Sequence, residues 1–286
     1  GLITAVNTNG FSVGSVANVN SSGKKYVGWC WDAGSGSPVS NTDGTITSTV
    51  KANPATGFSI VTYTGDANAS STVGHGLGSA PGMVIVKRRD NVANWTVWHQ
   101  GLSSYTHKLY LNTQDAEATG GNAIDAAPTS TVLELSSSGN GNGSGANYVA
   151  YCFSEVAGYS KFGSYTGNSS VGNSVTGLGF EPAFLLIKNA TDSAGSGESW
   201  YLYDNARDPV NTRYHKLQPN DSSIESASQV NNLVNFDSDG FTIQSTNAGL
   251  NYSGDTYIYM AFADTRDAQF NFDASGNKNN WETINI

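Results

Sequence analysis

The stretch YVAYCF, residues 148–153, decides the fold class of this chain of 286 residues. Its β-branched, aromatic and small apolar residues favour extended strands, as does the related stretch YIYMAF at residues 257–262. Similar runs recur between clusters of Gly, Asn, Ser and Asp, a pattern typical of strands joined by turns. The clearest predicted strands are residues 58–63, 83–88, 95–100, 108–112, 131–135, 148–155, 161–165, 183–188, 199–204, 240–245 and 257–264. We therefore predict an all-β fold of tandem antiparallel β-sandwich domains, jelly-roll-like in arrangement.

Two parts of the chain carry the same motifs in the same order. The motif YTG at residues 63–65 returns at 165–167, and GLG at residues 76–78 returns at 177–179. Further matching pairs are residues 84–87 with 185–188, 95–99 with 200–204, 107–109 with 215–217, and 148–153 with 257–262. Because the motifs recur in the same order after about 100 residues, we predict a repeat of domain size rather than a solenoid coil.

The repeat divides the chain into five expected segments. Residues 9–13, NGFSV, parallel residues 239–243, DGFTI, so the N-terminal region matches only the end of a repeat. The segments are residues 1–35 (closing hairpin of a partial repeat), 36–56 (linker), 57–158 (first β-sandwich repeat), 159–265 (second β-sandwich repeat) and 266–286 (C-terminal extension). We expect the two full repeats to superpose strand for strand.

Alternation within residues 148–153 predicts which face of that strand is buried. The bulky face, with Tyr151 and Phe153, is expected to be the core. The opposite face holds Cys152, whose equivalents are Cys30 and Ala261, so the position favours a small apolar residue. Both cysteines are therefore expected to be reduced and buried. Because both faces are apolar, we also expect cover on both sides and assembly of the chain as a homotrimer or a lattice.

Aromatic residues in two matched strands suggest a binding surface. If Trp95 and Trp200 face the core, then Trp98, Tyr201 and Tyr203 lie on the opposite, exposed face. Exposed aromatic rings stack on the apolar C–H faces of sugars, so these three residues are the candidate carbohydrate-binding site. The alternative is that a neighbouring sheet or subunit covers them.

Composition narrows the classes of partner. Only 13% of the residues are charged, and the net charge of −9 would repel phosphate backbones. No run of Lys and Arg offsets this repulsion, and no apolar run approaches the roughly 18 residues of a membrane-spanning helix. We expect no nucleic-acid partner and no membrane partner.

The sequence contains few residue patterns typical of catalytic or metal sites. The carboxylates Asp90, Asp115, Glu117, Asp204 and Asp208 could supply a glycosidase pair, but nothing in the linear sequence selects one. The alternating oxygen-bearing residues Asp273, Ser275, Asn277 and Asn279 form a weak Ca²⁺ candidate, since only one is charged and no closing bidentate acid follows. Apart from this possible Ca²⁺ we expect no cofactor, and we predict that the chain is not an enzyme.

Four motifs carry a resemblance to a known family. They are GFSIVTYTG at residues 57–65, GHGLG at 74–78, YVAYCF at 148–153 and YSKFGSYTG at 159–167. In these motifs the chain resembles a repeated β-rich domain of unknown function found in tail-fibre-like and structural proteins of marine bacteriophages. The resemblance implies no catalytic residues.

The resemblance implies a non-enzymatic protein at the virion surface or outside the cell: a tail fibre, an appendage or a capsid decoration. Its expected partners are copies of itself, other virion proteins and a host surface glycan. Two alternatives stay open. One is a polysaccharide-degrading tailspike module, and the other is a bacterial adhesin or surface-layer protein.

Overall fold

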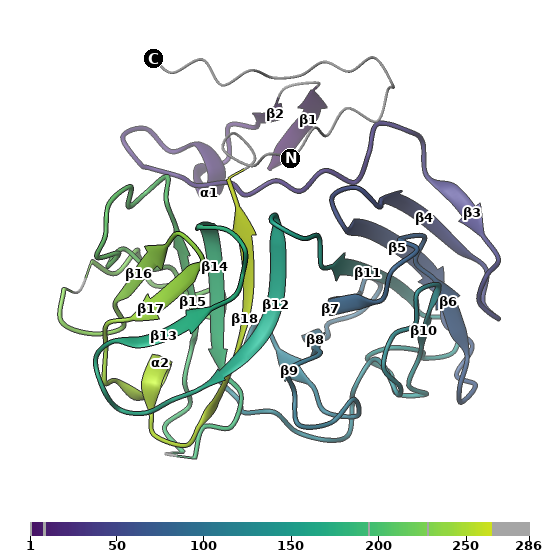
Figure 1. Cartoon of the computed structure of the whole chain (residues 1–286). Coiled ribbons are helices and arrows are strands. Elements are labelled where there is room, and N and C mark those ends of the chain that lie inside the picture. Colours follow the sequence, from purple (N-terminus) through teal and green to yellow (C-terminus); the bar gives the residue numbers. More distant parts are fainter. Residues whose placement is uncertain (1, 8–9, 194, 228, 265–286) are drawn as a thin grey trace. The chain divides into compact units, whose positions relative to one another are not determined.

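The computed structural model describes residues 2–7, 10–193, 195–227 and 229–264. These residues divide into a small N-terminal unit, residues 1–32, and a large unit from residue 33 onward. The described residues form eighteen strands and two helices of four residues each, which confirms the predicted all-β class (Figure 1). Neither of these helices is long and apolar enough to cross a membrane.

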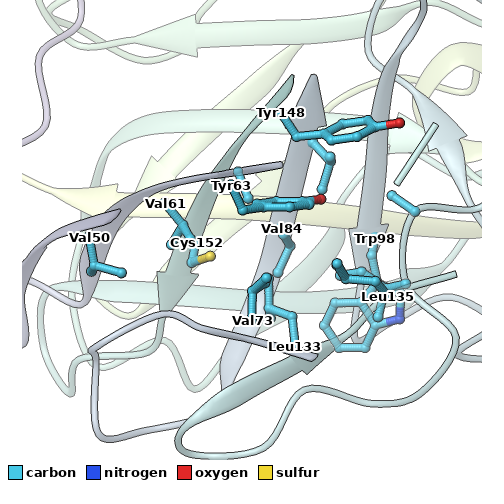
Figure 2. Packing of buried hydrophobic residues seen from close by; sticks show 14 of the residues in the cluster. Val50, Val61, Tyr63, Val73, Val84, Trp98, Leu133, Leu135, Tyr148 and Cys152 are labelled. Carbon is cyan, nitrogen blue, oxygen red and sulfur yellow. The ribbon is translucent and has the colours of Figure 1, made fainter. Parts of the chain in front are cut away.

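The first half of the large unit is a sandwich of two antiparallel sheets. Its main sheet has seven strands in the order β3 (Val39–Asn41), β4 (Ser48–Asn53), β5 (Phe58–Thr64), β11 (Asn147–Ser154), β7 (Pro81–Arg88), β8 (Trp95–His99) and β9 (Leu109–Tyr110). Its small sheet pairs β6 (Thr72–Gly74) with β10 (Val132–Glu134). Apolar side chains from both sheets, such as Val84, Tyr148, Val73 and Leu133, meet in one buried core (Figure 2).

The second half of the large unit has a second sandwich. Its main sheet has the order β12 (Ser160–Thr166), β18 (Thr256–Ala263), β14 (Pro182–Asn189) and β15 (Trp200–Asp204). Its small sheet has the order β13 (Asn173–Thr176), β17 (Gly240–Ile243) and β16 (Val234–Asp237), and α2 (Ala248–Asn251) precedes β18. The second core lies between these sheets and includes Leu185, Ile187, Phe241 and Tyr257.

Matched residues occupy matched places in the two main sheets. β11 pairs with β5 and β7, and β18 pairs in the same way with β12 and β14. Trp95 begins β8 opposite Lys87, and Trp200 begins β15 opposite Lys188. The strand connections of the two halves therefore follow the order that their motifs follow in the sequence.

The buried faces of the central strands differ from the prediction. Tyr148, Ala150 and Cys152 point into the first core, so the expectation that the bulky face of this strand lines the sandwich core is wrong. The bulky face is only partly buried at Tyr151, and Phe153 packs outside the sandwich, against the second half. Both faces carry apolar residues because each has a different neighbour to pack against.

The stretch expected to be a linker is part of the sheet. β3 and β4 lie within residues 36–56, and β4 pairs with β5 from Asn53 opposite Phe58 to Thr49 opposite Thr62. Short strands rich in Ser, Thr and Asn resemble a linker in composition. Their backbone pairing nevertheless extends the main sheet to seven strands.

An aromatic cluster joins the two sandwiches. The Phe153 ring of the first half lies 6.2 Å from each of the Phe162 and Phe262 rings of the second half, measured between centroids. Gly82 permits this close approach, because a Cβ there would lie 3.0 Å from the Cβ of Phe162. We call this contact region the junction.

Hydrogen bonds that span the junction fix its register. The Trp200 Nε1 donates to the Tyr110 carbonyl at 2.9 Å, and the Glu117 amide donates to the Ala190 carbonyl at 2.7 Å. The Lys188 Nζ donates to the Gln114 carbonyl at 3.2 Å. Directional bonds of this kind allow one arrangement of the two sandwiches, whereas apolar packing alone allows sliding.

The N-terminal unit contains a hairpin and one short helix. β1 (Ile3–Asn7) pairs with β2 (Gly10–Val13), and α1 (Ala17–Asn20) follows. Residues 24–31, which match β18 in sequence, carry no regular secondary structure. None of the described residues of this unit is buried.

Candidate functional site

The three predicted carbohydrate-binding residues are buried. Trp98 lies in the first core, and Tyr201 and Tyr203 lie in the second. The Tyr203 hydroxyl donates to the Asn232 carbonyl at 2.7 Å inside that core. The expectation that these rings form an exposed platform is therefore wrong, because their face of β8 and β15 is the one that packs into the sandwich.

An aromatic pair with one exposed member lies on the opposite face of the first main sheet. Trp95 retains 36% of its surface, and its ring stacks on the half-buried Tyr151 with centroids 6.3 Å apart and planes inclined by 21°. Asn112 Oδ1 accepts the Trp95 amide at 2.9 Å and so fixes the start of β8. We call Trp95 and Tyr151 the aromatic platform.

Polar groups surround the aromatic platform. Lys87 lies opposite Trp95 in the sheet, and its Nζ donates to the Ala93 carbonyl at 2.7 Å. Asn112 Nδ2 donates to Asn94 Oδ1 at 2.9 Å, which holds both amides beside β8. A flat apolar surface next to amide groups can stack on a sugar ring and exchange hydrogen bonds with its hydroxyls.

The equivalent surface of the second half is closed. Trp200 retains 1% of its surface, and Met260 stands where the first half has Tyr151. The first half of the chain covers this face through the junction, with the Trp200 Nε1 bound to the Tyr110 carbonyl. Sequence alternation separates Trp95 from Trp98, but it does not indicate which of the two faces the core.

The carboxylates proposed for a glycosidase pair have structural partners. Asp90 binds Arg88 at 2.6 Å and Asp204 binds Arg207 at 2.7 Å, while Glu117 accepts the Ser103 amide at 2.9 Å. Asp115, by contrast, is exposed. The Arg88 hydrogen bond lowers the pKa of Asp90, whereas a general acid requires a raised pKa.

Asp208 is bound in the same way. Burial raises its pKa, but hydrogen bonds from the backbone amides of His215 and Tyr214 outweigh that effect and lower it. The His215 Nδ1 lies 3.1 Å from the Asp208 Oδ1. This arrangement stabilises the charged carboxylate and fixes the loop after β15.

The predicted Ca²⁺ ligands Asp273, Ser275, Asn277 and Asn279 lie outside the described residues. Within the residues that the structure describes, no group of three or more His, Cys, Asp or Glu side chains is placed to hold a metal ion. Two buried histidines in this part of the chain bind backbone carbonyls, since His75 Nε2 lies 3.1 Å from the Thr129 oxygen and His99 Nε2 lies 3.0 Å from the Tyr259 oxygen.

The two cysteines have different environments. Both are free thiols, but Cys152 is buried in the first core whereas Cys30 is exposed. Burial raises the pKa of Cys152 to about 12, so its thiol is protonated and unreactive at neutral pH. The expectation of burial is wrong for Cys30 and confirmed for Cys152.

One family model matches most of the chain. Residues 1–266 match a family described as a domain of unknown function (DUF7483). The chain belongs to the DUF7483 family. Searches of curated proteins and of solved structures find no match. A single DUF7483 match covers the N-terminal unit and both sandwiches together, so the family assignment gives no activity and no boundary between the two halves.

Proposed function

We propose that this DUF7483 protein is a non-enzymatic structural component of a virion surface, built from tandem copies of one β-sandwich unit. The observation that carries the proposal is the junction, where the two sandwiches share buried aromatic packing and directional hydrogen bonds. A rigid connection of this kind suits a fibre, an appendage or a capsid decoration, which must hold its parts in a fixed order.

Identical local contacts support the proposal of copied units. In the first half the Tyr63 and Tyr148 rings stack on each other (Figure 2), with centroids 5.2 Å apart. In the second half the Tyr165 and Tyr257 rings stack with centroids 4.9 Å apart. A buried asparagine also binds matching loops in both halves. Asn142 accepts the Asp66 amide at 2.8 Å, and Asn251 accepts the Asn168 amide at 2.9 Å.

The assignment to a virion rests on the resemblance to structural proteins of marine bacteriophages. The expected partners are further copies of this chain, as a homotrimer or a lattice, and other virion proteins.

The buried carboxylates also favour a structural role. Asp204 binds Arg207, and Asp208 accepts hydrogen bonds from backbone amides, so both stabilise loops of the second sandwich.

Electron microscopy with an antibody against this chain tests the proposal. Particles released by the source organism are labelled and compared with its cell fractions. We expect label at regular positions on virions. Label on the cell envelope instead would favour the alternative of an adhesin or surface-layer protein, and label in the cytoplasm would refute both.

The aromatic platform favours host-glycan attachment as a second candidate function. We expect Trp95→Ala to weaken binding to surface glycans of the host about tenfold or more, because stacking area is lost. Tyr105→Ala is the matched control, since Tyr105 is 54% exposed and is not part of the platform. Equal binding by both variants and the unmodified chain would refute attachment through the platform.

The enzymatic alternative has a direct test. The chain is incubated with host capsular polysaccharide, and the products are analysed for new reducing ends and unsaturated uronates. We expect neither. Their appearance would identify a polysaccharide-degrading tailspike module and would overturn the structural proposal.

A further inference from the structure

The N-terminal unit repeats a contact that both sandwiches use. The Tyr26 hydroxyl donates to the Ala17 carbonyl at 2.7 Å and accepts the Ser21 amide at 2.9 Å. Tyr257 makes the same two bonds at the same sequence separations of nine and five residues, to the Ala248 carbonyl at 2.6 Å and from the Tyr252 amide at 2.8 Å.

The same contact occurs in the first sandwich. The Tyr148 hydroxyl donates to the Gly139 carbonyl at 2.7 Å and accepts the Gly143 amide at 2.8 Å, again over nine and five residues. In all three places this tyrosine closes one local structure, a short turn or helix that precedes it, and in the two sandwiches the tyrosine lies in the strand that follows. In the N-terminal unit the tyrosine contact is made although residues 24–31 do not form a strand.

The order of elements matches as well. β1, β2 and α1 correspond to β16, β17 and α2, and residues 24–31 correspond to β18. We call this series the back part of a unit. The front part is the segment that precedes it in the second sandwich, residues 159–232, which contains β12, β13, β14 and β15.

The residues that would face a core are exposed in the N-terminal unit. Phe11 retains 43% of its surface and Tyr26 retains 50%, whereas the matching Phe241 and Tyr257 retain none. Val13 likewise retains 39%, and its counterpart Ile243 is fully buried. Phe11, Val13 and Tyr26 are thus exposed in the N-terminal unit, whereas their counterparts in the second sandwich are buried.

The second sandwich shows what buries these residues. β13 pairs with β17, and β12 and β14 flank β18 on its two sides. The Tyr165 ring of β12 stacks on Tyr257 and meets the edge of Phe241 at 5.9 Å. All of these covering residues belong to the front part.

We propose that residues 1–32 form a docking surface for the front part of a DUF7483 unit. The partner is a polypeptide that carries antiparallel strands with the apolar pattern of β12 and β14, and it docks by adding those strands on both sides of residues 24–31. This inference rests on the proposal that the chain consists of copied units. Docking converts the exposed back part into a closed sandwich.

Cys30 reports whether the surface is occupied. It lies four residues after Tyr26, as Cys152 lies four residues after Tyr148, and the latter cysteine is fully buried. Docking of a front part therefore buries the Cys30 thiol. Cys152 serves as an internal control, because its burial depends only on the first sandwich.

The test places a copy of residues 159–232 directly before Ile3 in the full chain, and the rate of thiol labelling is measured at both cysteines. We expect Cys30 to react at least about tenfold more slowly than in the unmodified chain, with Cys152 unreactive in both. The matched control carries Leu185→Asp and Ile187→Asp in the added copy only, which removes two core residues of the front part.

Unchanged labelling of Cys30 in the fusion would overturn the proposal. A second fusion, with the front part of the first sandwich (residues 57–123) in the same place, separates poor folding of one added copy from a lack of affinity. If neither fusion protects Cys30, the proposal is wrong.

The unmodified chain is labelled at several protein concentrations as well. Protection of Cys30 that grows with concentration would mean that two copies cover each other's residues 1–32, and it would also refute the proposal. The assay does not depend on virion localisation, so the proposed function can fail separately.

Discussion

His99 connects the two sandwiches through the Nε2 of its ring, while its Nδ1 accepts a hydrogen bond within the first half. Its Nε2 lies 3.0 Å from the Tyr259 carbonyl, which can only accept, and its Nδ1 lies 2.9 Å from the Gly101 amide, which can only donate. The ring is therefore neutral, with its proton on Nε2. Burial, the main cause, lowers the pKa of His99 to about 4.

This low pKa predicts a loss of stability in mild acid. The unfolded chain protonates His99 near pH 6.5 and the folded chain only near pH 4, so the unfolded state binds more protons between these values. The contribution of His99 to the free energy of unfolding is fully present above about pH 6.5, and up to about 3 kcal/mol of it is lost as the pH drops to 4. Urea unfolding of the unmodified chain and of His99→Gln over this range measures the effect. An equal fall in the unmodified chain and in His99→Gln would contradict the assignment.

The aromatic platform shows what residue patterns can and cannot predict. Alternation correctly separates Trp95 from Trp98 onto opposite faces of β8. It does not say which face meets the small sheet, because β6 and β10 are distant in sequence and short. Alternation therefore places the exposed aromatic residue on the right strand but on the wrong face. The burial of Trp200 involves a contact with Tyr110, 90 residues away in the sequence.

At the scale of elements, the strand led by Tyr148 or Tyr257 is the most predictable part of the fold. Its composition identifies β11 and β18 with their approximate bounds. β3 and β4 escaped prediction because Ser, Thr and Asn form strands or loops according to what they pair with. The pairing partner, β5, is a property of the sheet and not of the local sequence.

The tyrosine contact should stabilise both sandwiches by a similar amount. Tyr148→Phe removes the partner of the Gly143 amide and the Gly139 carbonyl. Tyr257→Phe removes the partner of the Tyr252 amide and one of two donors to the Ala248 carbonyl, which keeps the Asn189 Nδ2 at 3.2 Å. We expect each variant to lower the free energy of unfolding by about 1–3 kcal/mol. Denaturant unfolding checks this, with the exposed Tyr105→Phe as a control within about 0.5 kcal/mol of the unmodified chain. A cost in only one half would contradict a shared structural role.

For the whole molecule, the junction explains features that no local pattern predicts. β18 is buried on both faces because one faces the second core and the other faces the first half of the chain. Phe162 lies at the centre of the junction, since it is 1% exposed and its ring contacts both Phe153 and Phe262. The two sandwiches should therefore unfold together rather than as independent domains.

Differential scanning calorimetry of the full chain tests this claim most directly. We predict one cooperative transition for the two sandwiches, and for Phe162→Ala a destabilisation of about 3–5 kcal/mol that separates it into two transitions. Phe236→Ala, which removes a ring from the second core and not from the junction, should lower the midpoint and keep one transition. Two independent transitions in the unmodified chain would contradict the account, because they would show that the junction does not join the sandwiches into one body.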